Sequence, residues 1–190
     1  MLQQTQVKTV IPYFNNFVKK IPNLKALSKT KEKKVLKLWE GLGFYRRAKS
    51  LHKTSKILIK NYNGKIPSTF IKLKELPGIG DYTTNVLLAL IYNQPRIGID
   101  GNVKRLLFRF FNVNSWDVES LFKTTRNADL AEAIMEFGAL ICKPKNPKCN
   151  ECKINKMCKY YKSESKFKLK KKMKIELKNY DIFCYLKKTK

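Results

Sequence analysis

The sequence predicts an all-α protein. Apolar residues recur at spacings of three and four along most of the chain, the period of helices that bury one face. Strand-type alternation is absent until a short apolar run at 180–186. A third observation is a Leu-Pro-Gly-Ile-Gly turn at 76–80, which joins a short helical pattern to an apolar one. With 190 residues, the chain has room for one or two compact domains.

The composition favours a polyanionic partner. Lys and Arg number 41 against 14 Asp and Glu, giving a formal net charge of +27. Codon bias toward Lys, Asn and Ile is an alternative explanation, so charge alone does not decide the matter. The sequence shows neither a secretory signal peptide nor an apolar run of membrane-spanning length. We therefore expect a soluble, cytoplasmic protein with no membrane partner.

Helical patterns fill the N-terminal part. The first covers 2–21, and Pro12 within it predicts a break into two helices. A second, at 33–39, is followed by a Gly-Leu-Gly stop. A third begins at Phe44 and Tyr45, which precede two arginines, and ends at an Asn-Gly pair. These aromatic residues either wedge between bases while the arginines hold phosphates, or pack beneath a neighbouring helix. The sequence leaves both alternatives open.

The hairpin turn at 76–80 is the motif on which the functional interpretation depends most. A helix predicted at 69–75 leads into it, and an apolar helical run follows at 86–92. Such a turn leaves backbone N–H groups bare at a helix N-terminus, where they suit a phosphate. We therefore interpret 69–92 as a helix-hairpin-helix phosphate clamp, with Gly78 and Gly80 as candidate DNA-binding residues.

Asp100 opens the next predicted helix, which carries Lys104, Arg105 and Arg109 at positions expected to be exposed. Its carboxylate has two possible roles. It could cap the helix N-terminus, or it could stabilise the positive charge that develops on a sugar as its base departs. The second role also requires an acid that protonates the base and a nucleotide flipped out of the duplex.

Four of the five cysteines form the pattern Cys142-x6-Cys149-x2-Cys152-x5-Cys158, which follows a helix predicted at 129–141. Four thiolates on a short loop suit an iron-sulfur cluster or a tetrahedral zinc ion. Zinc sites more often use two separated C-x2-C pairs, so the spacing favours iron-sulfur. Interspersed lysines would present ammonium groups to a phosphate backbone. The fifth cysteine, Cys184, is interpreted as a small buried residue.

The C-terminal part has a different composition. Residues 163–178 are lysine-rich, as expected of a solvated linker. The run at 180–186 would suit a strand, but a single strand has nothing to pair with. We expect it to be the first strand of a further domain, or a tail.

Together these motifs resemble the helix-hairpin-helix DNA glycosylase superfamily, and within it the adenine DNA glycosylases. The resemblance covers about residues 1–161. It rests on five motifs in order: Met-Leu-Gln-Gln-Thr-Gln-Val at 1–7, Gly-Leu-Gly at 41–43, the hairpin turn, Asp-Gly-Asn-Val-Lys-Arg at 100–105, and the cysteine loop.

The resemblance implies two helical domains with DNA in the cleft between them. The first, at 1–96, would be a six-helix bundle that contains the helix-hairpin-helix. The second, at 97–162, would hold the catalytic aspartate and a [4Fe-4S] cluster. Residues 163–190 would be a basic linker and the possible first strand of a missing C-terminal domain.

The implied reaction is hydrolysis of the N-glycosidic bond of an adenine mispaired with 8-oxoguanine or guanine. The partner would be double-stranded DNA, bound by a monomer associated with a bacterial nucleoid. Asp100 would be the catalytic carboxylate, with Asn102 beside it, and Tyr82 would line the adenine pocket. Leu2 and Gln4 would probe the opposite strand.

Position 82 separates the predicted reaction from that of the endonuclease III relatives. Those carry a lysine there that attacks the sugar and leads to strand cleavage, whereas water completes the reaction without it. Tyr82 therefore predicts a monofunctional glycosylase, with an endonuclease III-like glycosylase/AP lyase as the alternative.

Two departures from the family pattern affect the prediction. The family has a glutamate just ahead of Met-Leu-Gln-Gln that protonates the adenine, and the sequence begins after that position. The acid is thus expected to be absent, which leaves a catalytically impaired DNA-binding remnant as a further alternative. Phe44 stands where the family commonly has a tyrosine that wedges into the duplex, so it keeps the stacking plane without the hydroxyl.

Overall fold

The computed structural model describes residues 1–2, 5–112 and 124–163. Every regular element in these ranges is a helix, which confirms the all-α prediction. In order, the elements are α1 (Val7–Lys20), α2 (Leu24–Lys29), α3 (Glu32–Leu38), α4 (Tyr45–Tyr62), α5 (Phe70–Lys74), α6 (Asp81–Tyr92), α7 (Gly101–Phe111), α9 (Asn127–Leu140), the 3-10 turn η1 (Asn155–Met157) and α10 (Lys159–Lys162).

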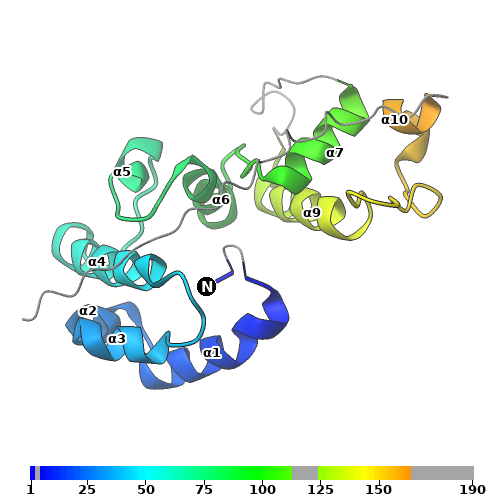
Figure 1. Ribbon diagram of the computed structural model, residues 1–190. Coiled ribbons are helices and arrows are strands. Elements are labelled where there is room, and N and C mark those ends of the chain that lie inside the picture. Colours follow the sequence, from blue (N-terminus) through cyan, green and yellow to red (C-terminus); the bar gives the residue numbers. More distant parts are fainter. Residues whose placement is uncertain (3–4, 113–123, 164–190) are drawn as a thin grey trace, which may run out of the picture.

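The helices gather into two groups joined through α6 (Figure 1). Helix α4 packs on α2 and α3 at one end, and α7 packs on α9 and α10 at the other. Helix α6 contacts both α5 and α9. Its Leu88 belongs to a core shared with α4 and α5, whereas its Ala89 belongs to a core shared with α7 and α9. Both groups of helices therefore pack on α6, the helix that follows the hairpin turn. The domain boundary at 96–97 stays a prediction.

The break predicted at Pro12 is wrong, because α1 continues through this residue as one helix. A proline inside a helix costs about 3 kcal/mol, since it clashes with the preceding turn and donates no hydrogen bond. Val10 and Phe17, on either side of it, are 5% and 7% exposed in the same core. Burying such side chains is worth about 1.5–3 kcal/mol each, which offsets the cost.

Asparagines end three of the helices. Asn63, Asn93 and Asn112 have φ of 50°, 50° and 54°, the left-handed conformation that asparagine tolerates better than most residues. Asn93 also donates to the carbonyl of Thr125 at 2.8 Å and accepts from the N–H of Ala128 at 2.9 Å. The end of α6 is thereby fixed to the start of α9.

Several predictions lie outside the described residues. They are the position of Gln4, most of the basic linker at 163–178, the strand at 180–186 and Cys184. Within the described ranges, no helix combines the length and the apolar character needed to cross a membrane.

Candidate functional site

The hairpin turn is seated on α4. Gly78 has φ of 78°, and a Cβ there would lie 2.6 Å from the Cβ of Ser50, so neither the conformation nor the space admits a side chain. The carbonyl of the preceding residue, Pro77, accepts a hydrogen bond from Thr54 Oγ1 at 3.0 Å. Contacts with Ser50 and Thr54, on one face of α4, thus fix the position of the turn.

Gly80 is the N-cap of α6 and supplies no capping side chain. A Cβ at Gly80 would meet nothing within 4 Å, so the turn faces open space. A phosphate oxygen could approach the first backbone N–H groups of α6 from this side. Asp81, at the first helical position, forms an ion pair with Lys74 Nζ at 2.6 Å. Asp81 therefore places a carboxylate beside the candidate phosphate clamp, which the turn motif alone does not indicate.

Asp100 caps α7, which confirms the first of its two predicted roles. Its Oδ1 accepts from the N–H groups of Asn102 and Val103, both at 2.8 Å. Its Oδ2 accepts from Asn102 Nδ2 at 3.2 Å. The carboxylate is half-buried and held in one orientation, and this geometry is compatible with the second role.

Tyr82 lies close to Asp100. Burial raises the pKa of the Tyr82 hydroxyl, and the charge of Asp100 raises it further, so the phenol is neutral and can donate. Its hydroxyl contacts Met135 Sδ of α9 at 3.7 Å. A Cβ on Gly98 would lie 2.7 Å from the Tyr82 ring, so only glycine allows this close packing. Three segments therefore hold an aromatic ring that is still 40% exposed beside the carboxylate.

Arg105 connects Asn102 to the loop that follows α9. It donates to Asn102 Oδ1 at 2.9 Å, to the Cys142 carbonyl at 2.9 Å and to the Gly138 carbonyl at 2.6 Å. Gly138 itself lies against the backbone of Asn102, since a Cβ there would be 3.0 Å from the carbonyl oxygen. The two partners of the Asn102 amide thus define its orientation: its NH2 group faces Asp100 and its oxygen faces Arg105.

The predicted exposure of Arg105 and Arg109 is wrong. Their residues are 8% and 5% exposed, whereas Lys104 is exposed as expected. Buried guanidinium groups need acceptors for their N–H groups. The loop after α9 supplies carbonyl oxygens for both, and it lies too far along the chain for the periodicity of α7 to reveal it.

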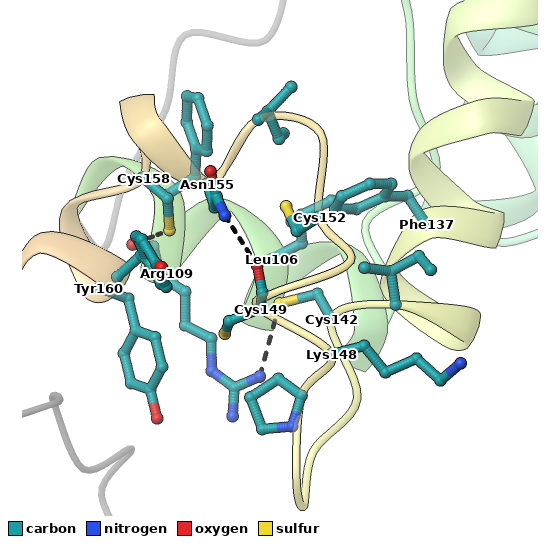
Figure 2. A pocket seen from close by; sticks show the side chains of 15 residues that line it. Leu106, Arg109, Phe137, Cys142, Lys148, Cys149, Cys152, Asn155, Cys158 and Tyr160 are labelled. Carbon is teal, nitrogen blue, oxygen red and sulfur yellow. Dashed lines mark hydrogen bonds between the residues drawn. The ribbon is translucent and has the colours of Figure 1, made fainter.

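The four predicted cysteine ligands line one pocket (Figure 2). Arg109 is at its edge, where it donates to Cys142 Sγ at 3.4 Å and to the Lys143 carbonyl at 2.6 Å. Asn155 donates to the Cys149 carbonyl at 3.0 Å. The bonds of Arg109 hold the loop against the C-terminal half of α7.

The thiols influence one another. Burial raises the pKa of Cys149, and the neighbouring Cys142 and Cys158 raise it further. The pKa of Cys152 is raised in the same way. No three His, Cys, Asp or Glu side chains among the residues described are arranged to hold a single metal ion. The loop thus gathers four soft ligands around a shared pocket, without a single-ion geometry.

Phe44 and Leu2 lie at the start of α4 and at the N-terminus. They are 57% and 58% exposed, and Tyr45 is 45% exposed. The alternative that Phe44 or Tyr45 packs beneath a neighbouring helix is therefore wrong. Phe44 has φ of 50° and ψ of 49°, an unusual conformation for an aromatic residue.

The model of the HhH-GPD superfamily of base excision DNA repair proteins matches residues 1–132, more than half of the chain. The chain belongs to this superfamily. An adenine DNA glycosylase from Buchnera aphidicola subsp. Schizaphis graminum is 40% identical, over 98% of this chain and 58% of the relative. The human adenine DNA glycosylase is 33% identical, over 83% of this chain and 31% of the relative. This HhH-GPD chain spans about half the length of the curated bacterial relatives it matches.

Solved structures agree with the family. A thermostable thymine-DNA glycosylase superposes with a TM-score of 0.75 at 27% identity, covering 84% of this chain and 79% of that one. An endonuclease III trapped on DNA superposes with a TM-score of 0.67 at 24% identity, covering 83% and 78%, and this likeness shows the fold alone. The matched HhH-GPD region includes the hairpin, Tyr82 and Asp100 but ends before the cysteine loop.

The sequence did not single out Gly98, Met135 or Gly138. Each acts through a tertiary contact that periodicity does not encode. A glycine two residues before the candidate catalytic carboxylate, and another inside a predicted helix, were the signals that could have indicated close packing.

Proposed function

We propose that this HhH-GPD protein is a DNA glycosylase that removes adenine mispaired with 8-oxoguanine or guanine. The observation that carries the proposal is the Asp100 carboxylate, which Asn102 and Val103 hold in one orientation within the matched HhH-GPD region. Tyr82 and Asp100 lie close enough for the carboxylate to shift the pKa of the phenol. Relatives that are 40% and 33% identical are named adenine DNA glycosylases.

In the proposed reaction, the bond between the sugar C1′ and the adenine N9 breaks, and its electron pair leaves with the base. The sugar becomes an oxocarbenium-like cation, which the Asp100 carboxylate stabilises across a short distance. Water then adds to C1′, its proton is released, and an abasic site remains. Asn102 fixes one carboxylate oxygen through its Nδ2 group, so the charge is already in place when the cation forms.

Proton transfer to the adenine requires a separate acid. By resemblance, this acid is a glutamate at a position ahead of Met1. Tyr82 is neutral and has no amine, so it forms no Schiff base with the abasic sugar. The proposal is therefore a monofunctional glycosylase that leaves the DNA strand uncut.

DNA binding would use three features on the described surface. The turn at Gly78 and Gly80 presents bare N–H groups to one phosphate, and Lys104 is exposed one turn beyond Asp100. Phe44 would enter the duplex as a wedge. Double-stranded DNA as the partner agrees with the match to a superfamily of base excision DNA repair proteins.

We also propose that the cysteine loop binds a [4Fe-4S] cluster through Cys142, Cys149, Cys152 and Cys158. The donor set fits the cluster, because four thiols, which are the ligands that iron-sulfur clusters use, line one pocket. When bound, the cluster would cross-link the loop. Purified protein with broad visible absorbance and iron in proportion to chain would support the cluster, whereas zinc in a colourless protein would contradict it.

The test uses the 190-residue chain and duplexes with adenine opposite 8-oxoguanine, guanine or thymine. With a glutamate added ahead of Met1, release of adenine from the first two, with strand breaks only after alkali, is expected. Borohydride trapping of a covalent adduct would instead favour the endonuclease III-like lyase. Tight mispair binding without base release would identify an impaired remnant, for which loss of the acid alone accounts for about 10²–10⁴ in rate.

A further inference from the structure

Arg47, in the first turn of α4, contacts the N-terminal segment and the turn that precedes α4. Its Nη1 donates to the Met1 carbonyl at 2.9 Å. Its Nη2 contacts Thr5 Oγ1 at 3.3 Å and the Gly43 carbonyl at 3.5 Å. The N-terminus accordingly lies beside the connection that enters α4 (Figure 1). One guanidinium thus fixes the N-terminal segment to the turn between α3 and α4.

The same guanidinium also contacts the exposed aromatic side chain. Its Cζ lies 4.7 Å from the centroid of the Phe44 ring and 5.9 Å from that of Trp39. Trp39 is 1% exposed and donates from Nε1 to the Gly43 carbonyl at 3.0 Å, so this side of the contact is anchored in the core. Phe44 therefore rests on a planar cation that is itself held by a buried residue.

We propose that Arg47 is a positioning residue for mispair recognition. It holds Phe44, Met1 and Thr5 in one fixed arrangement, which we call the wedge platform. This inference rests on the proposed function, because the platform matters only if Phe44 enters a duplex. It differs from a phosphate-binding role: Arg47 is half-buried and its Nη atoms donate within the protein, whereas the adjacent Arg46 is exposed.

The wedge platform reduces the conformational entropy that two exposed apolar side chains would lose on entering DNA. Phe44 is exposed and in the left-handed region, where an aromatic residue gains nothing from its own backbone preference. Leu2, on the segment that Arg47 also holds, is equally exposed. Flexible apolar side chains would lose conformational entropy on entering DNA, and a preorganised pair would not. Arg47 thus makes insertion at a mispair more favourable without touching the DNA.

The test compares Arg47→Met with Arg46→Met, which removes the same charge from the adjacent exposed position. Affinities are measured by fluorescence anisotropy for duplexes with adenine opposite 8-oxoguanine and adenine opposite thymine. A 2-aminopurine beside the mispair reports unstacking. Arg47→Met is expected to lower the preference for the mispair about tenfold and to abolish the 2-aminopurine signal. Arg46→Met should weaken binding to both duplexes equally.

Two further variants separate positioning from folding. Arg47→Lys keeps the charge but lacks the planar fork, so it should restore only part of the mispair preference and leave binding to the matched duplex unchanged. Phe44→Ala should lose the preference by itself, and adding Arg47→Met should cause no further loss. Hydrogen exchange at residues 1–6 should increase in Arg47→Met, while exchange in α6 stays as in the wild type.

An unchanged mispair preference in Arg47→Met would overturn the wedge platform alone. So would additive losses in the double variant, or an equal loss for both duplexes. A wild-type chain that binds the two duplexes with equal affinity would overturn the proposed function and the platform with it.

Discussion

Arg105→Met tests whether the loop after α9 supports the candidate catalytic residues. The variant removes a buried guanidinium that makes bonds of 2.9, 2.9 and 2.6 Å to Asn102 Oδ1 and to the carbonyls of Cys142 and Gly138. Hydrogen bonds to a charged group contribute about 1.5–3 kcal/mol each, and some of the orphaned acceptors regain water. We expect a loss of about 3–5 kcal/mol in the free energy of unfolding.

For a chain of this length, that loss lowers the Tm by about 10 °C. The assay is thermal unfolding followed by circular dichroism, together with single-turnover release of adenine. Release should slow by about tenfold or more, because the Asn102 amide loses the partner that sets its orientation toward Asp100. Lys104→Met is the matched control: it removes the same charge from the adjacent, exposed position. If both variants unfold at the same temperature, the supporting role of Arg105 is refuted.

Two other predictions concern residues around the site. Gly98→Ala places a methyl group 2.7 Å from the Tyr82 ring. It should reduce adenine release by about tenfold or more, since a misplaced catalytic-site group can cost about 10²-fold in rate. Gly101→Ala is the control, because a Cβ there meets nothing within 4 Å and should not destabilise the fold. Equal Tm values for the two variants would contradict the close packing at Gly98. Asp81→Asn removes the carboxylate beside the phosphate clamp and frees Lys74, so the affinity for any duplex should rise about threefold to tenfold at low salt. An affinity lowered by Asp81→Asn would show that no phosphate lies near this turn.

Local chemistry made much of the fold predictable. The turn at Gly78 and the cap at Asp100 depend on a few neighbouring residues, and both are found where the sequence places them. The α4 helix likewise ends at Asn63, beside a glycine. Pro12 was predicted to break a helix because the cost of a proline is local, whereas the compensating burial of Val10 and Phe17 is tertiary.

The candidate site was predictable only in part for the same reason. Asp100, Asn102 and Tyr82 come from motifs, and the structure places Tyr82 near Asp100. Arg105 and Arg109 were assigned to an exposed face because periodicity does not show that a loop 37 residues later supplies the acceptor for Arg105. Met135 reaches Tyr82 from α9 across 53 residues of sequence, and nothing in its own neighbourhood indicates this.

Adenine release by Asp100→Asn tests the catalytic role of the Asp100 carboxylate most directly. The amide keeps an oxygen for the N–H groups of Asn102 and Val103, so the cap and the Tm should be retained. The negative charge is lost, and release from an adenine opposite 8-oxoguanine should fall by about 10²–10³ under single-turnover conditions. Release at the wild-type rate, or a loss that merely follows a lowered Tm, would contradict the assignment of Asp100 as the catalytic carboxylate.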